Sequence, residues 1–235
     1  GEQIAERVRA HDHFAGYDAQ IFADRTALDG VCGGAEHMFP NFARRTYSPY
    51  IEMLRDGERI VMSEGMESAW PGLIGALLFD VQDALSRQKT QDNPTNRRGL
   101  VRTLIAAVEG LAWIYREHVT GIADTMEVLS ESERRALCET SSSVGEDGRI
   151  SEQRRFISTT ATIRLTSRIA ARCAPVDRVD FGVEGWTNLK QTIALRNRIT
   201  HPKAASDLEM GFDDIARAES AFFWFADVVI GEMDR

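Results

Sequence analysis

Apolar residues recur at intervals of three and four along most of this chain, the pattern of amphipathic α-helices that bury one face in a common core. The pattern predicts long helices over residues 71–89, 98–118, 154–173, 186–201 and 212–233. A short helix should open at Ser130, where Ser-Glu-Ser-Glu forms a capping-box sequence. No segment alternates apolar and polar positions with β-branched side chains, so strands are not expected. We therefore expect an all-α fold, an up-and-down helical bundle with additional N-terminal helices.

The chain divides into an N-terminal helical extension, residues 1–66, and a helical bundle, residues 67–235. Within the extension, glycine and proline residues mark 30–50 as loop-like, and 50–66 can form one more helix. The sequence SSSVGEDG at 141–148 predicts a flexible loop between two helices of the bundle.

The last predicted helix carries four consecutive aromatic residues, Phe222, Phe223, Trp224 and Phe225. At about 100° per residue, four neighbours spread over most of the circumference of a helix. We therefore expect some of these rings to remain outside the chain's own core. An exposed aromatic patch of this kind is typical of a self-complementary dimer face.

The stretch 186–203 reads WTNLKQTIALRNRITHPK and contains the clearest candidate for chemistry. Its apolar stripe, Trp186, Leu189 and Ile193, continues in the last turn onto polar side chains, namely Arg196, Asn197 and Thr200. An arginine that shares a face with core residues is expected to be paired or used, because burying a lone charge is costly. The helix should end at His201, since a residue that precedes proline is pushed out of the α region.

The segment Arg196-Asn197-Arg198-Ile199-Thr200-His201 resembles the signature of the HEPN superfamily. In that signature a histidine follows an arginine after four to six residues, and a polar residue often stands directly after the arginine. The resemblance implies an all-helical domain and, in many members, a metal-independent ribonuclease of the kind found among toxins and defence effectors. Other members of the superfamily are non-catalytic.

The resemblance also implies roles for individual residues. Arg196 and His201 would be catalytic, with Asn197 beside them. Histidine can take or give a proton near neutral pH, and the planar guanidinium of an arginine can hold a phosphate through two hydrogen bonds. The neighbours that would contact substrate are Arg198, Thr200 and Lys203. Two protomers of such proteins usually pair their motifs in one cleft, so a homodimer is expected.

One position departs from a variant of the family. Some HEPN toxins carry a tyrosine two residues after the histidine, which a nucleotidyltransferase antitoxin modifies. Lys203 occupies that position here, so control by this modification is not expected. Another protein inhibitor or antitoxin remains open as a partner.

Charged residues outside the motif each have two interpretations. Arg164, Arg168 and Arg172 recur every four residues on one side of the helix predicted over 154–173. This ladder could follow an RNA backbone, or it could be a solvated face paired with acidic neighbours. Glu109 borders the apolar stripe of its helix. It could orient a catalytic residue, or it could be a half-buried carboxylate paired with an arginine.

Charge and composition narrow the choice of function. The net charge of −8 argues against indiscriminate binding of nucleic acid. Residues 149–203, which contain the motif, nevertheless carry 11 basic and 4 acidic residues. A phosphate-handling site inside an acidic protein has this pattern, and so does a solvated helix face.

Cofactors, metals and membranes are not indicated. Cys32, Cys138 and Cys173 are far apart and have no metal-ligand spacing, which fits a reducing cytoplasm. No apolar run reaches the length of a membrane span, and the first residues lack the pattern of a signal peptide.

Three hypotheses follow for the function. The first is a metal-independent endoribonuclease that attacks RNA through the RNA's own 2′-hydroxyl group and leaves a 2′,3′-cyclic phosphate. The alternative is a non-catalytic HEPN-like helical module that binds a nucleotide or a protein partner. A purely structural bundle is the third, in which Arg196 would be held in a core ion pair.

Overall fold

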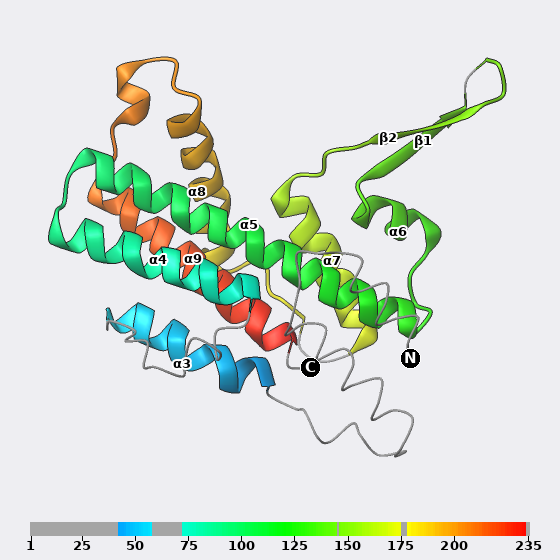
Figure 1. Cartoon of the computed structure of the whole chain (residues 1–235), viewed down its shortest axis with the longest axis horizontal. Coiled ribbons are helices and arrows are strands. Elements are labelled where there is room, and N and C mark those ends of the chain that lie inside the picture. Colours follow the sequence, from blue (N-terminus) through cyan, green and yellow to red (C-terminus); the bar gives the residue numbers. More distant parts are fainter. Residues whose placement is uncertain (1–41, 58–71, 145, 175–177, 234–235) are drawn as a thin grey trace.

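In the computed structural model, the described residues are 42–57, 72–144, 146–174 and 178–233. They form a bundle of α-helices with one small hairpin, as Figure 1 shows, and this confirms the all-α prediction. The helices are α3 (Phe42–Asp56), α4 (Gly72–Thr90), α5 (Pro94–Thr125), α6 (Glu131–Leu137), α7 (Thr159–Cys173), α8 (Glu184–Thr200) and α9 (Phe212–Met233). The other elements are strands β1 (Thr140–Val144) and β2 (Ile150–Arg154), and the short 3-10 helix η2 (Ala205–Leu208).

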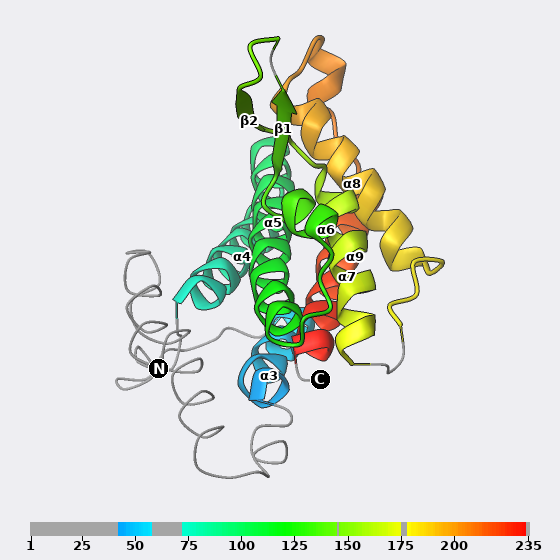
Figure 2. The same ribbon diagram turned by 90° about the vertical axis from the view of Figure 1, so that its right-hand side faces the viewer.

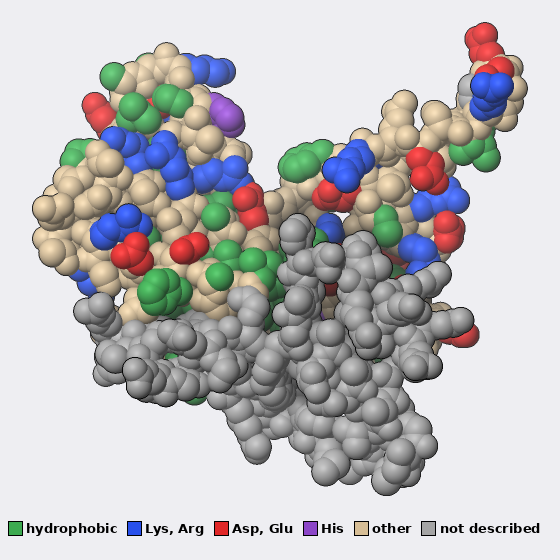
Figure 3. Space-filling model, in the orientation of Figure 1, with side chains coloured by type: hydrophobic (Ala, Val, Ile, Leu, Met, Phe, Trp, Pro, Cys, Tyr) green, Lys and Arg blue, Asp and Glu red, His purple; other side chains and the backbone are tan. Residues whose placement is uncertain are grey.

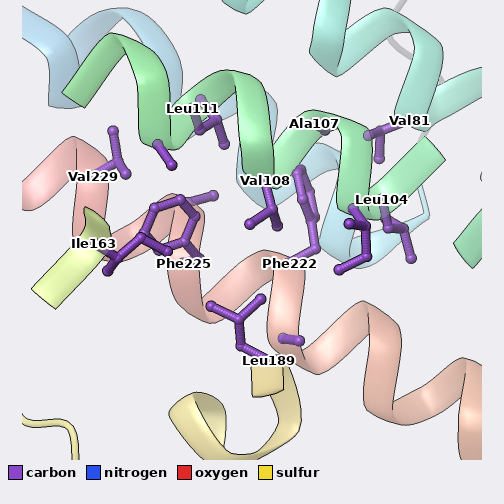
Figure 4. Packing of buried hydrophobic residues seen from close by; sticks show 14 of the residues in the cluster. Val81, Leu104, Ala107, Val108, Leu111, Ile163, Leu189, Phe222, Phe225 and Val229 are labelled. Carbon is purple, nitrogen blue, oxygen red and sulfur yellow. The ribbon is translucent and has the colours of Figure 1, made fainter. Parts of the chain in front are cut away.

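Helix α5 is the central element of the bundle. It packs against α4, α7, α8 and α9, and the two views in Figures 1 and 2 show these helices around it. Figure 4 shows Phe222 and Phe225 of α9 between Val108 of α5 and Leu189 of α8. All four side chains are fully buried. Large aromatic side chains dominate the energetics of such a core, which fixes α8 and its motif against α5.

The starts of two helices follow from their capping residues. Helix α5 begins at Pro94, four residues before the predicted start, because the side chain of Asn93 accepts a hydrogen bond from the N–H of Asn96 at 2.9 Å. At α6 the predicted capping box is confirmed. There Ser130 Oγ accepts from the N–H of Glu133 at 3.3 Å, and Glu133 Oε2 accepts from the N–H of Ser130 at 3.0 Å.

The hairpin corrects two predictions. Strands were not expected, and 141–148 was predicted to be a loop, yet the chain forms the antiparallel pair β1 and β2. Most residues of the pair are polar and exposed, so the two-residue hydrophobic period is absent. Gly148, with φ +75°, supplies a turn conformation that favours glycine.

The helix predicted over 154–173 begins later than expected, at Thr159, where the side chain of Ser158 caps it. Residues before Ser158 belong to β2 or to extended chain. Phe156 precedes the helix and is 86% exposed.

Helix α3 corrects the expectation for the extension. It begins at Phe42, within the segment expected to be a loop, and it packs against α9. The guanidinium of Arg55 lies 5.2 Å from the ring centre of Phe223. The other expected extension residues, 1–41 and 58–66, lie outside the described part of the chain.

Two of the four consecutive aromatic rings of α9 lie in the core and two remain partly exposed, as expected from their spread around the helix. Phe222 and Phe225 are fully buried, while Phe223 and Trp224 are half-buried. Trp224 packs against Trp186, with ring centres 6.0 Å apart, and Gly185 makes room for its ring. The most exposed aromatic residue of this helix is Phe212, which is 69% exposed.

Candidate functional site

The motif lies in the last turn of α8 and just beyond it. The helix ends at Thr200, and His201 leaves the α region with φ −123° and ψ 58°, as the following Pro202 predicts. The N–H of His201 still donates to the carbonyl of Asn197 at 3.0 Å. The chain therefore turns away from the helix axis at the histidine itself.

Arg196 is held by Glu109, which lies on the neighbouring helix α5. Nη2 of Arg196 donates to Oε1 of Glu109, and the two groups form an ion pair. The side chains are 25% and 41% exposed, so the pair lies at the boundary between core and solvent. Among the described residues, Nε of Arg196 is buried and has no hydrogen-bond partner. The prediction that an arginine on this face needs a partner is confirmed, and Glu109 is that partner.

Four arginines bind the backbone around and after the motif, and we name them the arginine clamp: Arg97, Arg98, Arg102 and Arg198. Their guanidinium groups donate to backbone carbonyls at 2.7–3.3 Å, the acceptors being those of Ile199, Ser206, Leu208, Glu209 and Met210. Carbonyls at the end of a helix have no intrahelical partner and carry partial negative charge, so cations bind there favourably. The clamp therefore fixes the end of α8 and the segment that follows His201.

The segment after the motif also contains its own small hydrogen-bonded turn. Oδ2 of Asp207 accepts from the N–H of Lys203 at 2.7 Å and from the N–H of Ala204 at 3.0 Å. These two backbone hydrogen bonds lower the pKa of the Asp207 carboxyl. The backbone N–H of Lys203 is therefore hydrogen-bonded within the turn, whereas its side chain is exposed.

Positive charge gathers at the motif end of the molecule, where Arg198 is close enough to Asp207 to help lower the pKa of that carboxyl. Within the described part of the chain, no carboxylate lies within ion-pair distance of Arg98, Arg102, Arg198, His201 or Lys203. Figure 3 shows Lys and Arg side chains gathered across this end of the molecule, over the N-terminal part of α5 and the segment after α8. Such a surface attracts anions.

The structure groups six of the predicted site residues and separates two from them. Those on the last turn of α8 and in the following segment are Arg196, Asn197, Arg198, Thr200, His201 and Lys203. Arg164 of α7 lies instead over the rings of Phe181 and Trp186, 5.3 and 5.1 Å from their centres. Trp186 precedes Arg196 by ten residues, about 15 Å along the helix axis. Arg168 is exposed one turn further along α7.

The third arginine of the ladder confirms the paired alternative at its own position. Arg172 donates to Oε2 of Glu133 at 2.9 Å. This hydrogen bond, with that from the N–H of Ser130, lowers the pKa of Glu133 to about 2. The ladder is thus not a uniform basic stripe, because Arg164 lies over two aromatic rings and Arg172 is paired with Glu133.

Sequence analysis did not single out Arg97, Arg98 and Arg102, three members of the clamp. The sequence feature that could have indicated them is the presence of three arginines within six residues at the start of α5. Only the packing of α8 against α5 brings those side chains to the end of α8.

Within the described ranges, no group of three His, Cys, Asp or Glu side chains is placed to hold a metal ion. The helices there are also too short or too polar to cross a membrane. An open hollow of about 880 Å³ lies between α6 and the base of the hairpin, and none of the motif residues lines it.

No family model matches this chain, and no curated protein or solved structure matches it significantly.

Proposed function

We propose that this chain is a metal-independent endoribonuclease of the HEPN type, a toxin or defence-like enzyme that acts in the cytoplasm. The observation that supports this best is the placement of Arg196. Its guanidinium is oriented by Glu109, remains a quarter exposed, and stands five residues before an exposed histidine at the end of the helix. A guanidinium and an imidazole five residues apart in the chain are groups that suit cleavage of RNA by its own 2′-hydroxyl group.

In the proposed reaction, the 2′-oxygen of the RNA attacks the adjacent phosphorus while His201 takes the proton of the 2′-hydroxyl group. The bond between phosphorus and the 5′-oxygen breaks, which leaves a 2′,3′-cyclic phosphate and a 5′-hydroxyl end. Arg196 stabilises the negative charge that builds on the phosphorus-bound oxygens. Asn197, next to Arg196 in the chain, can hold a phosphate oxygen or the histidine.

The departing 5′-oxygen needs a proton, and a second motif can deliver it. The family resemblance implies a homodimer in which two motifs share one cleft. His201 of the second protomer would then act as the acid while the first acts as the base. Because the two motifs carry like charges, their approach is favoured when an anionic phosphate lies between them.

Substrate binding is supported by the basic side chains at the motif end that form no ion pair. Arg198 and Thr200 lie between Arg196 and His201 in the chain, and Lys203 follows His201 by two residues. Arg98 and Arg102 add positive charge from α5. Arg164 and Arg168 lie on α7, away from this group, so a contact with RNA there would involve a longer strand.

The deciding experiment incubates the purified full chain with a mixed-sequence RNA in excess EDTA and analyses the new ends. We expect cleavage that is insensitive to EDTA, with 2′,3′-cyclic phosphate and 5′-hydroxyl ends. Cleavage that stops with EDTA and returns with a divalent cation would point to another active site. Absence of cleavage in preparations of every oligomeric state would remove the proposal.

A second candidate is a non-catalytic module, and the ion pair between Arg196 and Glu109 favours it. In that case the pair holds α8 against α5, and the basic end binds a nucleotide or an acidic protein partner without chemistry. The discriminating measurement compares binding and cleavage on the same sample. Retention of a nucleotide without any cleavage of RNA would favour the module.

A further inference from the structure

The hairpin of β1 and β2 extends away from the helical bundle, as Figures 1 and 3 show. Every residue of β2 is exposed. Three apolar side chains are exposed on or beside the hairpin: Val144 at 72%, Ile150 at 73% and Phe156 at 86%. A two-stranded hairpin is marginally stable alone, and an open strand edge is a template for pairing with another chain.

The free edge belongs to β2, and its hydrogen-bonding groups can be assigned. Helix α6 contacts β1, so β2 forms the side of the hairpin that is turned away from α6. The N–H of Arg155 donates to the carbonyl of Glu139 at 2.7 Å, so the odd-numbered residues of β2 exchange hydrogen bonds with β1. By alternation, the N–H and carbonyl groups of Ile150, Glu152 and Arg154 point toward the free edge.

These residues define one favourable register for pairing β2 with a second β2. With a two-fold axis at Gln153, Glu152 lies opposite Arg154 of the second copy, and the reciprocal pair repeats the contact. Ile150 then lies opposite Phe156 of the second copy. An axis at Glu152 or at Arg154 would place two like charges directly opposite each other, which is unfavourable.

The charged side chains that this register places opposite each other are not engaged in ion pairs within the chain's described residues. Among the described residues, neither Glu152 nor Arg154 has an ion-pair partner in its own chain. The apolar residues also align. Val144 is opposite Ile150 within the hairpin, so Phe156 of the second copy extends a row of three apolar side chains on one face.

We propose that two copies of this chain pair through β2 and form a four-stranded antiparallel sheet with its two-fold axis at Gln153. The occupant of the open edge is therefore a second copy of the same chain. This inference is independent of the proposed ribonuclease activity, because it uses no residue of the motif.

Charge reversal on the full chain tests the register by sedimentation over a range of concentrations. Glu152→Arg and Arg154→Glu each create two like-charge pairs per dimer, and each should raise the dissociation constant about tenfold or more. The double variant Glu152→Arg/Arg154→Glu restores opposite charges and should return the dissociation constant close to that of the wild type. Glu146→Arg, in the turn of the hairpin and outside the paired residues, is the matched control and should have no effect.

A cross-link tests the axis directly. Gln153→Cys places two thiols in a non-hydrogen-bonded antiparallel pair, where Cα atoms lie about 4.5 Å apart and a disulfide can form. Oxidation should give a covalent dimer whose linked peptides, identified by mass spectrometry, both contain position 153. Ser151→Cys lies off the axis and should give little covalent dimer. A wild type that stays monomeric at every soluble concentration, or single reversals that leave the dimer unchanged, would overturn the proposal.

Discussion

Arg196, in the last turn of α8, forms an ion pair with Glu109 of α5, a residue 87 positions earlier in the chain. Both side chains remain partly exposed, and a partly exposed ion pair contributes at most about 1 kcal/mol to stability. The pair does more to fix the direction of the guanidinium than to stabilise the bundle. It also leaves the guanidinium accessible from solvent at the end of the molecule where other basic side chains gather.

Substitution of Arg196 by lysine should separate catalysis from stability. Lysine keeps the positive charge but loses the planar guanidinium that contacts a phosphate at two points. We expect RNA cleavage to fall about 100-fold or more, the usual cost of removing one oriented charge-stabilising donor. The thermal midpoint should fall by about 3 °C at most, because the ion pair is partly exposed. A larger fall in the midpoint with cleavage retained would identify the pair as structural.

Glu109 offers a graded test of the positioning role. In Glu109→Gln the side chain can still accept a hydrogen bond from Arg196, whereas in Glu109→Ala it cannot. We expect Glu109→Ala to lower kcat more than Glu109→Gln does, with little change in KM for a short RNA, since the proposed role of Glu109 is to orient Arg196 and not to bind RNA. Equal losses in both variants, matched by equal losses in unfolding free energy, would instead show that Glu109 acts through stability alone.

Substitution of His201 by alanine should abolish cleavage and leave the fold unchanged. The side chain is exposed at the end of α8, so its truncation removes little packing. Far-ultraviolet circular dichroism and the thermal midpoint should match those of the wild type. The matched control is Lys190→Ala, an exposed position in the first half of the same helix, which should keep full activity. Cleavage that persists in rigorously purified His201→Ala protein would remove the catalytic role of this residue.

The features that sequence analysis predicted well depend on local signals. The bounds of α9 agree with the prediction, and α8 ends where Pro202 requires it. The capping box at Ser130 is likewise encoded within four residues. Each signal acts over a single turn of helix, so one sequence is sufficient to recognise it.

The features that it missed depend on tertiary packing or lack a hydrophobic period. The arginine clamp exists because α8 packs beside the start of α5, and no local pattern marks that contact. The hairpin is exposed on both faces, so its strands have no apolar stripe. The contacts of Phe223 with Arg55 of α3 and of Trp224 with Trp186 could not be foreseen from the sequence of α9 alone.

The capping box of α6 should show a defined dependence on pH. Hydrogen bonds from Arg172 and from the N–H of Ser130 lower the pKa of Glu133 from 4.5 to about 2 in the folded chain. Its contribution to stability is therefore complete above about pH 4.5 and is lost as the pH falls toward 2. Glutamine at this position keeps the geometry of the box but removes the charge.

We expect Glu133→Gln to lower the free energy of unfolding at pH 7 by about 1 kcal/mol. The difference from the wild type should shrink as the pH is lowered toward 2. Urea unfolding at several pH values measures this difference. Glu131→Gln, on a more exposed side chain of the same first turn, is the control and should change little at any pH. A difference that stays constant across this range would exclude a contribution from the charge of Glu133.

The arginine clamp should couple the end of α8 to catalysis, and Arg102 provides the sharpest test. Its guanidinium donates to the carbonyl of Ile199 at 2.7 Å, two residues before His201. Substitution of Arg102 by alanine leaves that carbonyl without this partner, which should cost about 1–2 kcal/mol and lower the thermal midpoint by roughly 2–6 °C. Because the end of the helix then loosens beside the histidine, kcat/KM should fall further than the loss of stability explains.

The measurement that separates the two effects is kcat/KM at a temperature well below the midpoint of every variant, where all of them are folded. Arg102→Lys keeps a charged donor near the carbonyl and should recover part of the loss. Arg87→Ala removes an exposed arginine of α4 that pairs with Asp83, and it should change neither quantity by much. If Arg102→Ala lowered the thermal midpoint while kcat/KM stayed at the wild-type value, the clamp would be a support of the fold without influence on the site.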